Sequence, residues 1–209
     1  VKKLTKQNIP VRVLSRNVSK AKKMFGNTVE IIEGDLIEVK DLKSLVNGVT
    51  HLLAAHGADH EPGERAYELI DFGGMKKALK SIPKGQKTHI IYMSSIYVER
   101  KNPPFVFPRR ALYWKRKTEQ LIQAGNHPYT IVRPCWLTNL RGSEQRIKAE
   151  QGDKGDGKIA REDVAEVMVQ AMRFESAKGK VFEVYNVPGA PVKKWNLFFS
   201  ELELDMNRQ

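Results

Sequence analysis

Short, nearly all-apolar segments alternate along this chain with segments in which apolar residues recur at helical spacing. The short segments are residues 11–16, 29–33, 50–55, 88–93, 129–133 and 181–185, and the helical ones include residues 42–46, 69–79, 112–122 and 164–172. A strand that is apolar on both faces is typical of a parallel sheet covered by helices on each side, since neither face meets water. The alternation therefore predicts an α/β fold of the doubly wound kind.

The chain contains neither a flexible linker nor an internal repeat. Its 209 residues are enough for one sizeable core, so we expect a single domain over residues 1–209. Two irregular insertions are predicted, a proline-rich one at residues 100–110 and one rich in glycine and charge at residues 140–158.

No apolar stretch approaches the roughly 18 residues that a membrane helix needs, and the first residues lack the apolar core of a signal peptide. Cys135 is the only cysteine, which excludes an intrachain disulfide and a multi-cysteine metal site. We therefore expect a soluble, cytoplasmic protein without a membrane span and without a bound metal.

The formal net charge of +12 fits two kinds of partner, a nucleic acid or a small molecule that carries phosphate. Residues 109–117 mix cations with aromatic residues, a combination found on nucleic-acid surfaces. The same segment has helical spacing, and Glu119 stands where it can pair with Lys115. The alternation of strands and helices accounts for the segment better, so we expect no nucleic-acid partner.

In a doubly wound fold the ligand lies beyond the carboxyl ends of the parallel strands, so the residues that follow each strand are candidates for a site. These are Arg16, Asn17, Asp35, residues 55–58, Ser94, Ser95 and residues 133–136.

Short motifs at and near these positions follow one another in an order typical of a known family. They are VLSR at 13–16, GDL at 34–36, DFG at 71–73, MSS at 93–95, WKRKTE at 114–119, YTIVRP at 129–134 and REDVA at 161–165. In this order and spacing the chain resembles the atypical, NmrA-like short-chain dehydrogenases/reductases as far as the strand that begins near residue 181. The resemblance implies a Rossmann fold and an NAD(P)(H) cofactor.

Members of this family begin with a strand and a Gly-x-x-Gly-x-x-Gly turn, which binds the pyrophosphate at a helix N-terminus. Residues 1–7 resemble the end of the helix that follows this turn. We therefore expect the first strand and the glycine-rich turn to lie upstream of Val1, within about 20 to 25 further residues of the natural protein.

The resemblance places Arg16 beside the adenosine ribose, with Asn17 in the same loop. An acidic residue there would accept from the ribose 2′-hydroxyl, whereas a guanidinium can bind a 2′-phosphate through two hydrogen bonds. NADP(H) is thus favoured over NAD(H). The alternative is a surface arginine at the end of a strand.

The resemblance also places Asp35 and Leu36 beside the adenine ring, although a turn or a helix cap is an equally ordinary role for Asp35. The loop that packs against adenine and ribose consists of Ala54, Ala55, His56 and Gly57. Small residues in it let the backbone approach the cofactor. His56 could touch the substrate, and its alternative is a solvated side chain.

Ser94 and Ser95 end the strand that carries the catalytic serine of the family, whose hydroxyl hydrogen-bonds the substrate carbonyl. We choose Ser95 as the catalytic residue, and the alternative is a pair of hydroxyls that terminate a strand. The next strand runs into the loop along the nicotinamide, whose cofactor contacts would be Arg133, Pro134, Cys135 and Trp136. Cys135 stands where relatives commonly have glycine, and without an evident activating base we expect it to pack.

A literal Tyr-x-x-x-Lys is formed by Tyr113 and Lys117, and in the family this tyrosine is the acid and the lysine holds the ribose. In the resembled proteins, however, a glutamate follows the lysine by four residues, and here Glu119 follows Lys115. The tyrosine position then falls on Ala111. Because each residue turns a helix by about 100°, the two lysines cannot both face the cleft. We predict that Lys115 is the active lysine and that a tyrosine acid is absent.

Two functions follow from the resemblance. The first is an NADPH-dependent reductase that passes a hydride to a carbonyl, quinone or flavin. The second is a non-enzymatic NADP(H)-binding redox sensor or assembly factor with a protein partner. We favour the reductase, although the fold does not choose between them, and the sequence identifies neither the acceptor nor the oligomeric state.

Overall fold

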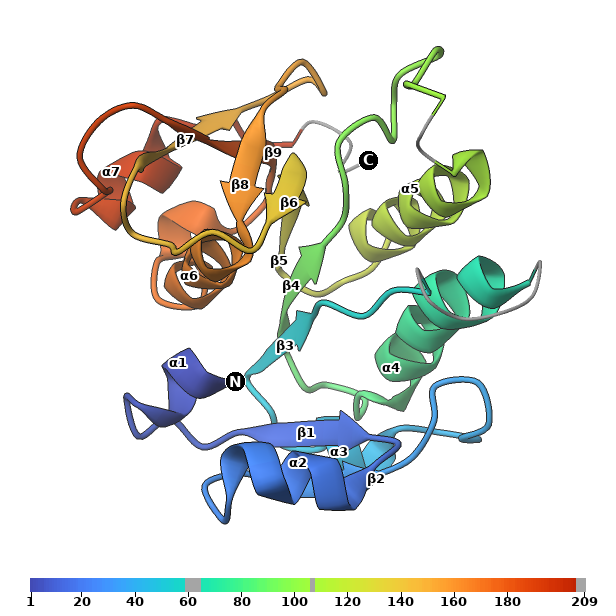
Figure 1. Cartoon of the computed structure of the whole chain (residues 1–209). Coiled ribbons are helices and arrows are strands. Elements are labelled where there is room, and N and C mark those ends of the chain that lie inside the picture. Colours follow the sequence, from blue (N-terminus) through green and yellow to red (C-terminus); the bar gives the residue numbers. More distant parts are fainter. Residues whose placement is uncertain (59–64, 106–107, 206–209) are drawn as a thin grey trace.

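The computed structural model describes residues 1–58, 65–105 and 108–205 (Figure 1). Its helices are α1 (Lys2–Thr5), α2 (Val18–Phe25), α3 (Lys43–Val46), the π-helix η1 (Tyr67–Gly74), α4 (Met75–Ser81), α5 (Arg109–Gln123), α6 (Arg161–Ala171), the 3-10 helix η2 (Glu175–Ala177) and α7 (Trp195–Ser200). Its strands are β1 (Arg12–Ser15), β2 (Glu30–Glu33), β3 (His51–Ala54), β4 (His89–Met93), β5 (Tyr129–Pro134), β6 (Trp136–Thr138), β7 (Arg146–Glu150), β8 (Lys158–Ala160) and β9 (Lys180–Val187). No helix within the described residues is long and apolar enough to cross a membrane.

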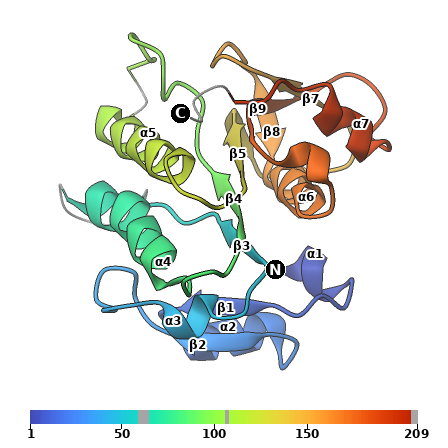
Figure 2. The ribbon, with the colours of Figure 1, turned by 180° about the vertical axis from the view of Figure 1, so that it is seen from behind.

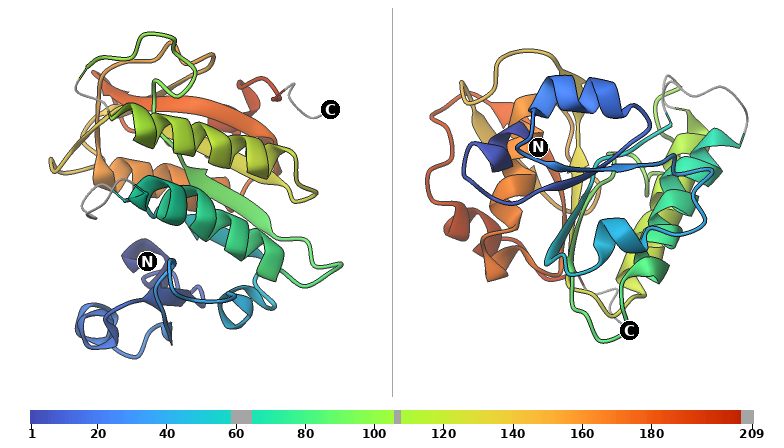
Figure 3. Two further views of the ribbon diagram at one scale, coloured as in Figure 1. Left: turned by 90° about the vertical axis from the view of Figure 1, so that its right-hand side faces the viewer. Right: turned by 90° about the horizontal axis from the view of Figure 1, so that it is seen from below.

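The main sheet has five strands in the order β3-β4-β5-β9-β7, and all neighbours are parallel except β7 and β9. The side chains of successive residues in β4 lie on opposite faces of the sheet, as the pleat requires. Ile90 packs with Met75 of α4 and Ile122 of α5, whereas Ile91 packs with Val167 of α6. Figures 2 and 3 show α4 and α5 on one face and α6 on the other. The predicted α/β fold with helices on both faces is confirmed.

The segment 140–158 is less irregular than predicted, because it contains β7 and the start of β8. β7 pairs antiparallel with β9 and forms an edge of the main sheet. Its side chains alternate, with Arg146 and Lys148 exposed and Ile147 buried between them. Charges on an edge strand discourage pairing with other chains, and they also conceal the strand in the sequence. β8 pairs with β6 in a separate two-stranded sheet.

β1 and β2 pair in parallel with each other but not with the five-stranded sheet. A cavity of about 1520 Å³ is lined by β1, β3 and parts of α4 and α6. Leu14 and Leu52 line it from the two sheets, and Met168 lines it from α6. The predicted sheet is therefore divided at this point, and the additional first strand stays a prediction.

Candidate cofactor site

The parallel register brings the carboxyl ends of β3, β4 and β5 to one edge of the main sheet. Ala54 lies opposite Tyr92, and Met93 lies opposite Val132. The segments that follow these strands therefore leave the sheet together. They contain most of the residues predicted to form the site, while Arg16 and Asp35 follow the separate pair β1 and β2.

Arg16 and Asp35 lie together beyond β1 and β2. Arg16 Nη1 is 3.4 Å from Asp35 Oδ2, and the two side chains are 60% and 22% exposed. Asp35 Oδ1 also accepts the backbone N–H of Ile37 at 2.7 Å, which is the turn contact expected from the alternative role of Asp35. This is a solvent-exposed ion pair, in which water competes for both partners.

Asn17 begins α2, where its side-chain oxygen accepts the backbone N–H of Lys20 at 2.8 Å. Such a cap satisfies one of the unpaired donors of the first helical turn. Leu36, Ala54, Ala55 and His56 line the large cavity. Leu36 also explains Gly74, because a Cβ there would lie 3.1 Å from Leu36 Cδ1.

His56 is half-buried between β3 and η1, and its Nε2 lies 3.4 Å from the carbonyl oxygen of Asp71. Burial lowers the pKa of His56, although the Asp71 carboxylate opposes this shift. The ring is therefore neutral near pH 7.

Lys115 projects from the buried face of α5 toward η1. Its Nζ lies 2.9 Å from Asp71 Oδ1, and Asp71 is fully buried. Asp71 Oδ2 accepts the backbone N–H of Ala58 at 3.1 Å. A Cβ on Gly57 would lie 3.8 Å from Lys115 Nζ, so the amino group is next to the loop that follows β3. The structure thus joins Lys115 to the predicted cofactor loop through Asp71.

Lys117 and Tyr113 lie on the other face of α5. Both are exposed, and Lys117 Nζ lies 5.6 Å from the centre of the Tyr113 ring. Ala111, at the position that the family gives to its tyrosine, is buried. The two lysines face opposite directions, as the helical geometry requires.

Ser94 and Ser95 follow β4. The backbone N–H of Ser94 donates to the carbonyl of Val132, which continues the ladder with β5. Ser94 is buried, and within the described residues its hydroxyl makes no hydrogen bond. An unpaired buried hydroxyl costs about 1–3 kcal/mol, so a polar partner from a bound molecule would be favourable here. Ser95 is half-buried.

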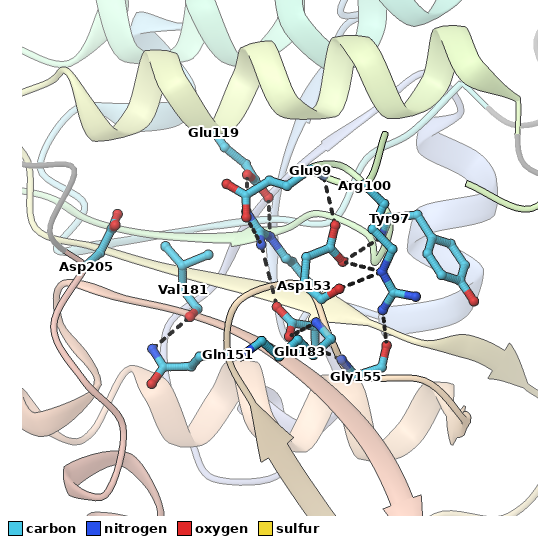
Figure 4. Close-up of polar contacts among 12 residues, drawn as sticks. Tyr97, Glu99, Arg100, Glu119, Gln151, Asp153, Gly155, Val181, Glu183 and Asp205 are labelled. Atoms are coloured by element: carbon cyan, nitrogen blue, oxygen red, sulfur yellow. Dashed lines mark hydrogen bonds and ion pairs between the residues drawn. The ribbon is translucent and has the colours of Figure 1, made fainter. Parts of the chain in front are cut away.

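Arg133 lies inside the protein, and three carboxylates surround it. Figure 4 labels these carboxylates, Glu99, Glu119 and Glu183. Arg133 Nε and Nη2 donate to the two oxygens of Glu119 at 2.9 and 2.7 Å, and its Nη1 donates to Glu99 at 2.9 Å. Glu183 lies 3.5 Å from the same Nη1. These contacts give the side chain a structural role, and its predicted contact with the cofactor stays a prediction.

The segment after Arg133 leads from the buried strand toward the surface. Pro134 and Cys135 are buried, while Trp136 is 38% exposed. Burial raises the pKa of the Cys135 thiol to about 12, so the sulfur stays protonated and unreactive near pH 7. This agrees with a packing role.

Sequence reasoning gave Asp71 no role, although it quoted the motif that contains it. The signal was present, because an aspartate within the apolar run 69–72 is rarely buried without a partner. Sequence reasoning also missed the contacts of Asp153, because no pattern in its glycine-rich loop predicts them. The described residues hold no group of three or more histidine, cysteine and carboxylate side chains that would bind a metal ion.

Residues 1–175 match the model of a family described as NAD(P)H-binding. The chain belongs to this NAD(P)H-binding family. The prediction of an NAD(P)-binding family is thereby confirmed.

Two curated plant proteins are similar to this NAD(P)H-binding chain. An uncharacterized chloroplastic protein of Arabidopsis thaliana is 28% identical over 91% of the chain and 66% of its own length. Sanguinarine reductase of Eschscholzia californica is 31% identical over 65% of the chain and 53% of its own length. The match thus spans less than two thirds of either relative.

Solved structures show the same fold. A Bacillus halodurans protein with a provisional NAD-dependent epimerase/dehydratase name matches with a TM-score of 0.79 and 24% identity, over 95% of this chain and 91% of its own. A short-chain dehydrogenase/reductase of Veillonella parvula in complex with NADP matches with a TM-score of 0.66 and 16% identity, over 90% of each chain.

Proposed function

We propose that this protein is an NADPH-dependent reductase whose acceptor is a quinone, a flavin or a carbonyl compound. Arg16 would bind the 2′-phosphate, and Asp35 would lie beside the adenine. Lys115 would hold the nicotinamide ribose, and the loop 133–136 would lie along the nicotinamide. When bound, the cofactor supplies a hydride.

The observation that carries the proposal is the position of Lys115. Its amino group is held beside Gly57 at the carboxyl edge of the sheet by the buried Asp71. A lysine on the solvated face of α5 would have no such partner, and Lys117 is that case. The unpaired hydroxyl of Ser94 adds a second polar group that a bound molecule would satisfy.

The preferred class of acceptor follows from the residue that α5 has at the tyrosine position. Ala111 stands at the tyrosine position, so the inward face of this helix offers no phenol there as a proton donor. Quinones and flavins take up protons without a phenol beside the hydride acceptor, and we therefore favour them over carbonyl compounds. The reductase name of the plant relative supports a reductase in general.

A second function remains, a non-enzymatic NADP(H)-binding sensor or assembly factor with a protein partner. The same alanine at position 111 favours it, because cofactor binding needs no acid. A cytoplasmic location and the lack of a nucleic-acid partner are also proposed, on the sequence alone.

The deciding experiment titrates the purified protein with NADPH and with NADH by calorimetry, and then follows NADPH oxidation with quinones, flavins and aldehydes. The reductase predicts NADPH binding and turnover of a quinone or flavin. Binding without turnover would support the sensor. A protein that binds neither nucleotide would overturn both functions.

A further inference from the structure

Two loops at the carboxyl edge of the sheet are joined by one carboxylate (Figure 4). Asp153, in the segment between β7 and β8, is only 4% exposed. Its Oδ1 accepts the backbone N–H of Tyr97, and its Oδ2 accepts the backbone N–H of Glu99, both at 2.8 Å. One side chain therefore holds two amides of the segment that follows Ser94 and Ser95.

Further contacts near this carboxylate involve the same two loops. Arg100 Nε donates to the carbonyl of Asp153 at 2.5 Å, and its Nη2 donates to the carbonyl of Gly155 at 2.8 Å. The guanidinium carbon lies 4.3 Å from the centre of the Tyr97 ring. The Tyr97 hydroxyl donates to Asp156 at 2.9 Å. The three hydrogen bonds join the loop 97–100 to the loop 153–156, and the stacking of Arg100 on Tyr97 lies within the first of these loops.

The backbone at both ends of the central contact is unusual. Tyr97 has φ 70° and Asp153 has φ 53°, in the left-handed region that residues other than glycine seldom adopt. For an aromatic residue this conformation persists only when the surroundings determine it, and it is often found at functional sites. The carboxylate of Asp153 is such a determinant for Tyr97.

The sheet itself holds the segment only as far as Ile96. The N–H groups of Ser94 and Ile96 donate to Val132 and Pro134 of β5, and the Asp153 contacts begin at Tyr97. We propose that Asp153 is a positioning residue, which fixes the backbone after β4 and thereby the direction of the Ser94 and Ser95 hydroxyls. Its kinetic consequence rests on the proposed reductase function.

The contacts between the loops 97–100 and 153–156, which we call the clamp, are connected to the buried charges around Arg133. Glu99, whose N–H is held by Asp153, accepts a hydrogen bond from Arg133 Nη1 and lies 2.6 Å from Arg116 Nη2. Loss of the Asp153 carboxylate would therefore move Glu99 as well as Tyr97. The effect of Asp153 on the site passes through these two residues and not through contact with a substrate.

Asp153→Asn and Asp153→Ala in the full chain test the proposal. Asparagine tolerates the left-handed backbone, but its amide nitrogen cannot accept the second N–H. The matched control is Tyr129→Phe, which removes the hydrogen bond from a fully buried hydroxyl to Asp205 at the other end of β5. It perturbs a buried polar contact without touching the clamp.

We expect kcat with the best acceptor to fall at least tenfold in Asp153→Asn and further in Asp153→Ala, because small displacements of positioning groups are costly. The Kd for NADPH should stay within about twofold, since the side chain of Asp153 bonds Tyr97 and Glu99 and not Arg16, Asp35 or Lys115. By NMR, amide exchange at Tyr97 and Glu99 should accelerate, and the Ser95 amide resonance should shift. Tyr129→Phe should lower Tm and leave kcat unchanged.

If Asp153→Asn behaves like Tyr129→Phe, with a lower Tm and an unchanged kcat, Asp153 only stabilises the fold and the proposal is overturned. If the wild-type protein reduces no acceptor, the reductase function fails, and the NMR result still decides about the clamp. In that case faster exchange at Tyr97 with an unmoved Ser95 resonance would refute it, and a shifted Ser95 resonance would support it. Should Asp153→Ala not fold, Asp153→Asn alone decides.

Discussion

The two sides of the candidate site differ in how much of their charge is already fixed by the protein. Beyond β1 and β2, Arg16 and Asp35 form a pair at 3.4 Å whose side chains are largely or partly exposed. Beside β4 and β5, Arg133 and Glu119 form two hydrogen bonds and are almost completely buried. The strands follow the same division, since β1 is half-buried throughout and β5 is buried throughout.

The difference indicates which side can respond to a ligand. A solvent-exposed ion pair is weak, so a phosphate that binds there can take the place of its carboxylate at little cost in free energy. A buried, bidentate pair cannot be opened without leaving a charge unpaired in the interior. We therefore expect substitutions beside β5 to act mainly on stability, and substitutions beyond β1 to act mainly on cofactor binding.

The largest effect should come from Arg133→Met compared with Arg16→Met. The first leaves Glu119 and Glu183 buried without this cation, which should lower the free energy of unfolding by about 3–5 kcal/mol. The second removes an exposed pair and should cost less than about 1 kcal/mol. Urea unfolding followed by circular dichroism measures both, and equal losses would contradict the comparison.

A group at the amino-terminal end of β4 and β5 should make the stability of the protein depend on pH. Burial, with His51 and Lys178 nearby, lowers the pKa of His89 to about 4, and its Nε2 lies 2.9 Å from Thr130 Oγ1. Because the folded-state pKa is below the unfolded value of about 6.5, the unfolded chain binds more protons between these values. Stability is complete above about pH 6.5 and is lost as the pH falls toward about 4.

From about pH 7 to about pH 5 the His89 contribution should fall by about 2 kcal/mol. His89→Gln does not titrate, so the difference in unfolding free energy between wild type and variant should narrow over this range. A difference that is constant with pH would show that His89 titrates normally in the folded protein.

On the β1 side, Arg16→Ala should remove most of the preference for NADPH over NADH. The charge-assisted pair with the 2′-phosphate is worth roughly 1.5–3 kcal/mol before solvent screening, so wild type should bind NADPH at least several-fold more tightly. Arg12→Ala, at the start of the same strand, is the control that should keep the preference. Calorimetric titration with both nucleotides tests this, and equal wild-type affinities would refute it.

The strands that were predicted from the sequence are those that form short apolar runs. β4 and β5 are apolar runs buried on both faces, so composition alone reveals them. β7 was missed because its exposed charges interrupt the pattern, although Ile147 is buried. The division of the sheet between β1 and β3 depends on hydrogen bonds between strands, which no single segment encodes.

The site was predicted less completely, for a related reason. Lys115 was found because its distance from Glu119 fixes a helical register, and the structure buries both residues on one face. Its partner Asp71 lies on η1, far away in the sequence, and no spacing rule connects them. The position of Arg133 at the end of a buried strand suggested a ligand contact, whereas its partners in the structure are carboxylates of the protein.

The smallest effect expected is also the one that tests the register of α5. Lys115→Ala should weaken NADPH binding by about tenfold, which is about 1.4 kcal/mol, whereas Lys117→Ala and Tyr113→Phe should change it little. Lys117 is the matched control, because it lies two positions along the same helix and faces solvent. Calorimetric titration of the three variants measures the difference.

Lys115→Ala alone also leaves the Asp71 carboxylate buried without its cation, which lowers stability for a reason unrelated to the cofactor. The double variant Asp71→Asn/Lys115→Ala separates the two effects. It should regain part of the lost stability, since a neutral amide is easier to bury, but it should not regain NADPH affinity. If affinity returns with stability, Lys115 serves only the fold. If Lys117→Ala and Tyr113→Phe abolish turnover while Lys115→Ala is silent, the literal Tyr-x-x-x-Lys register is the functional one.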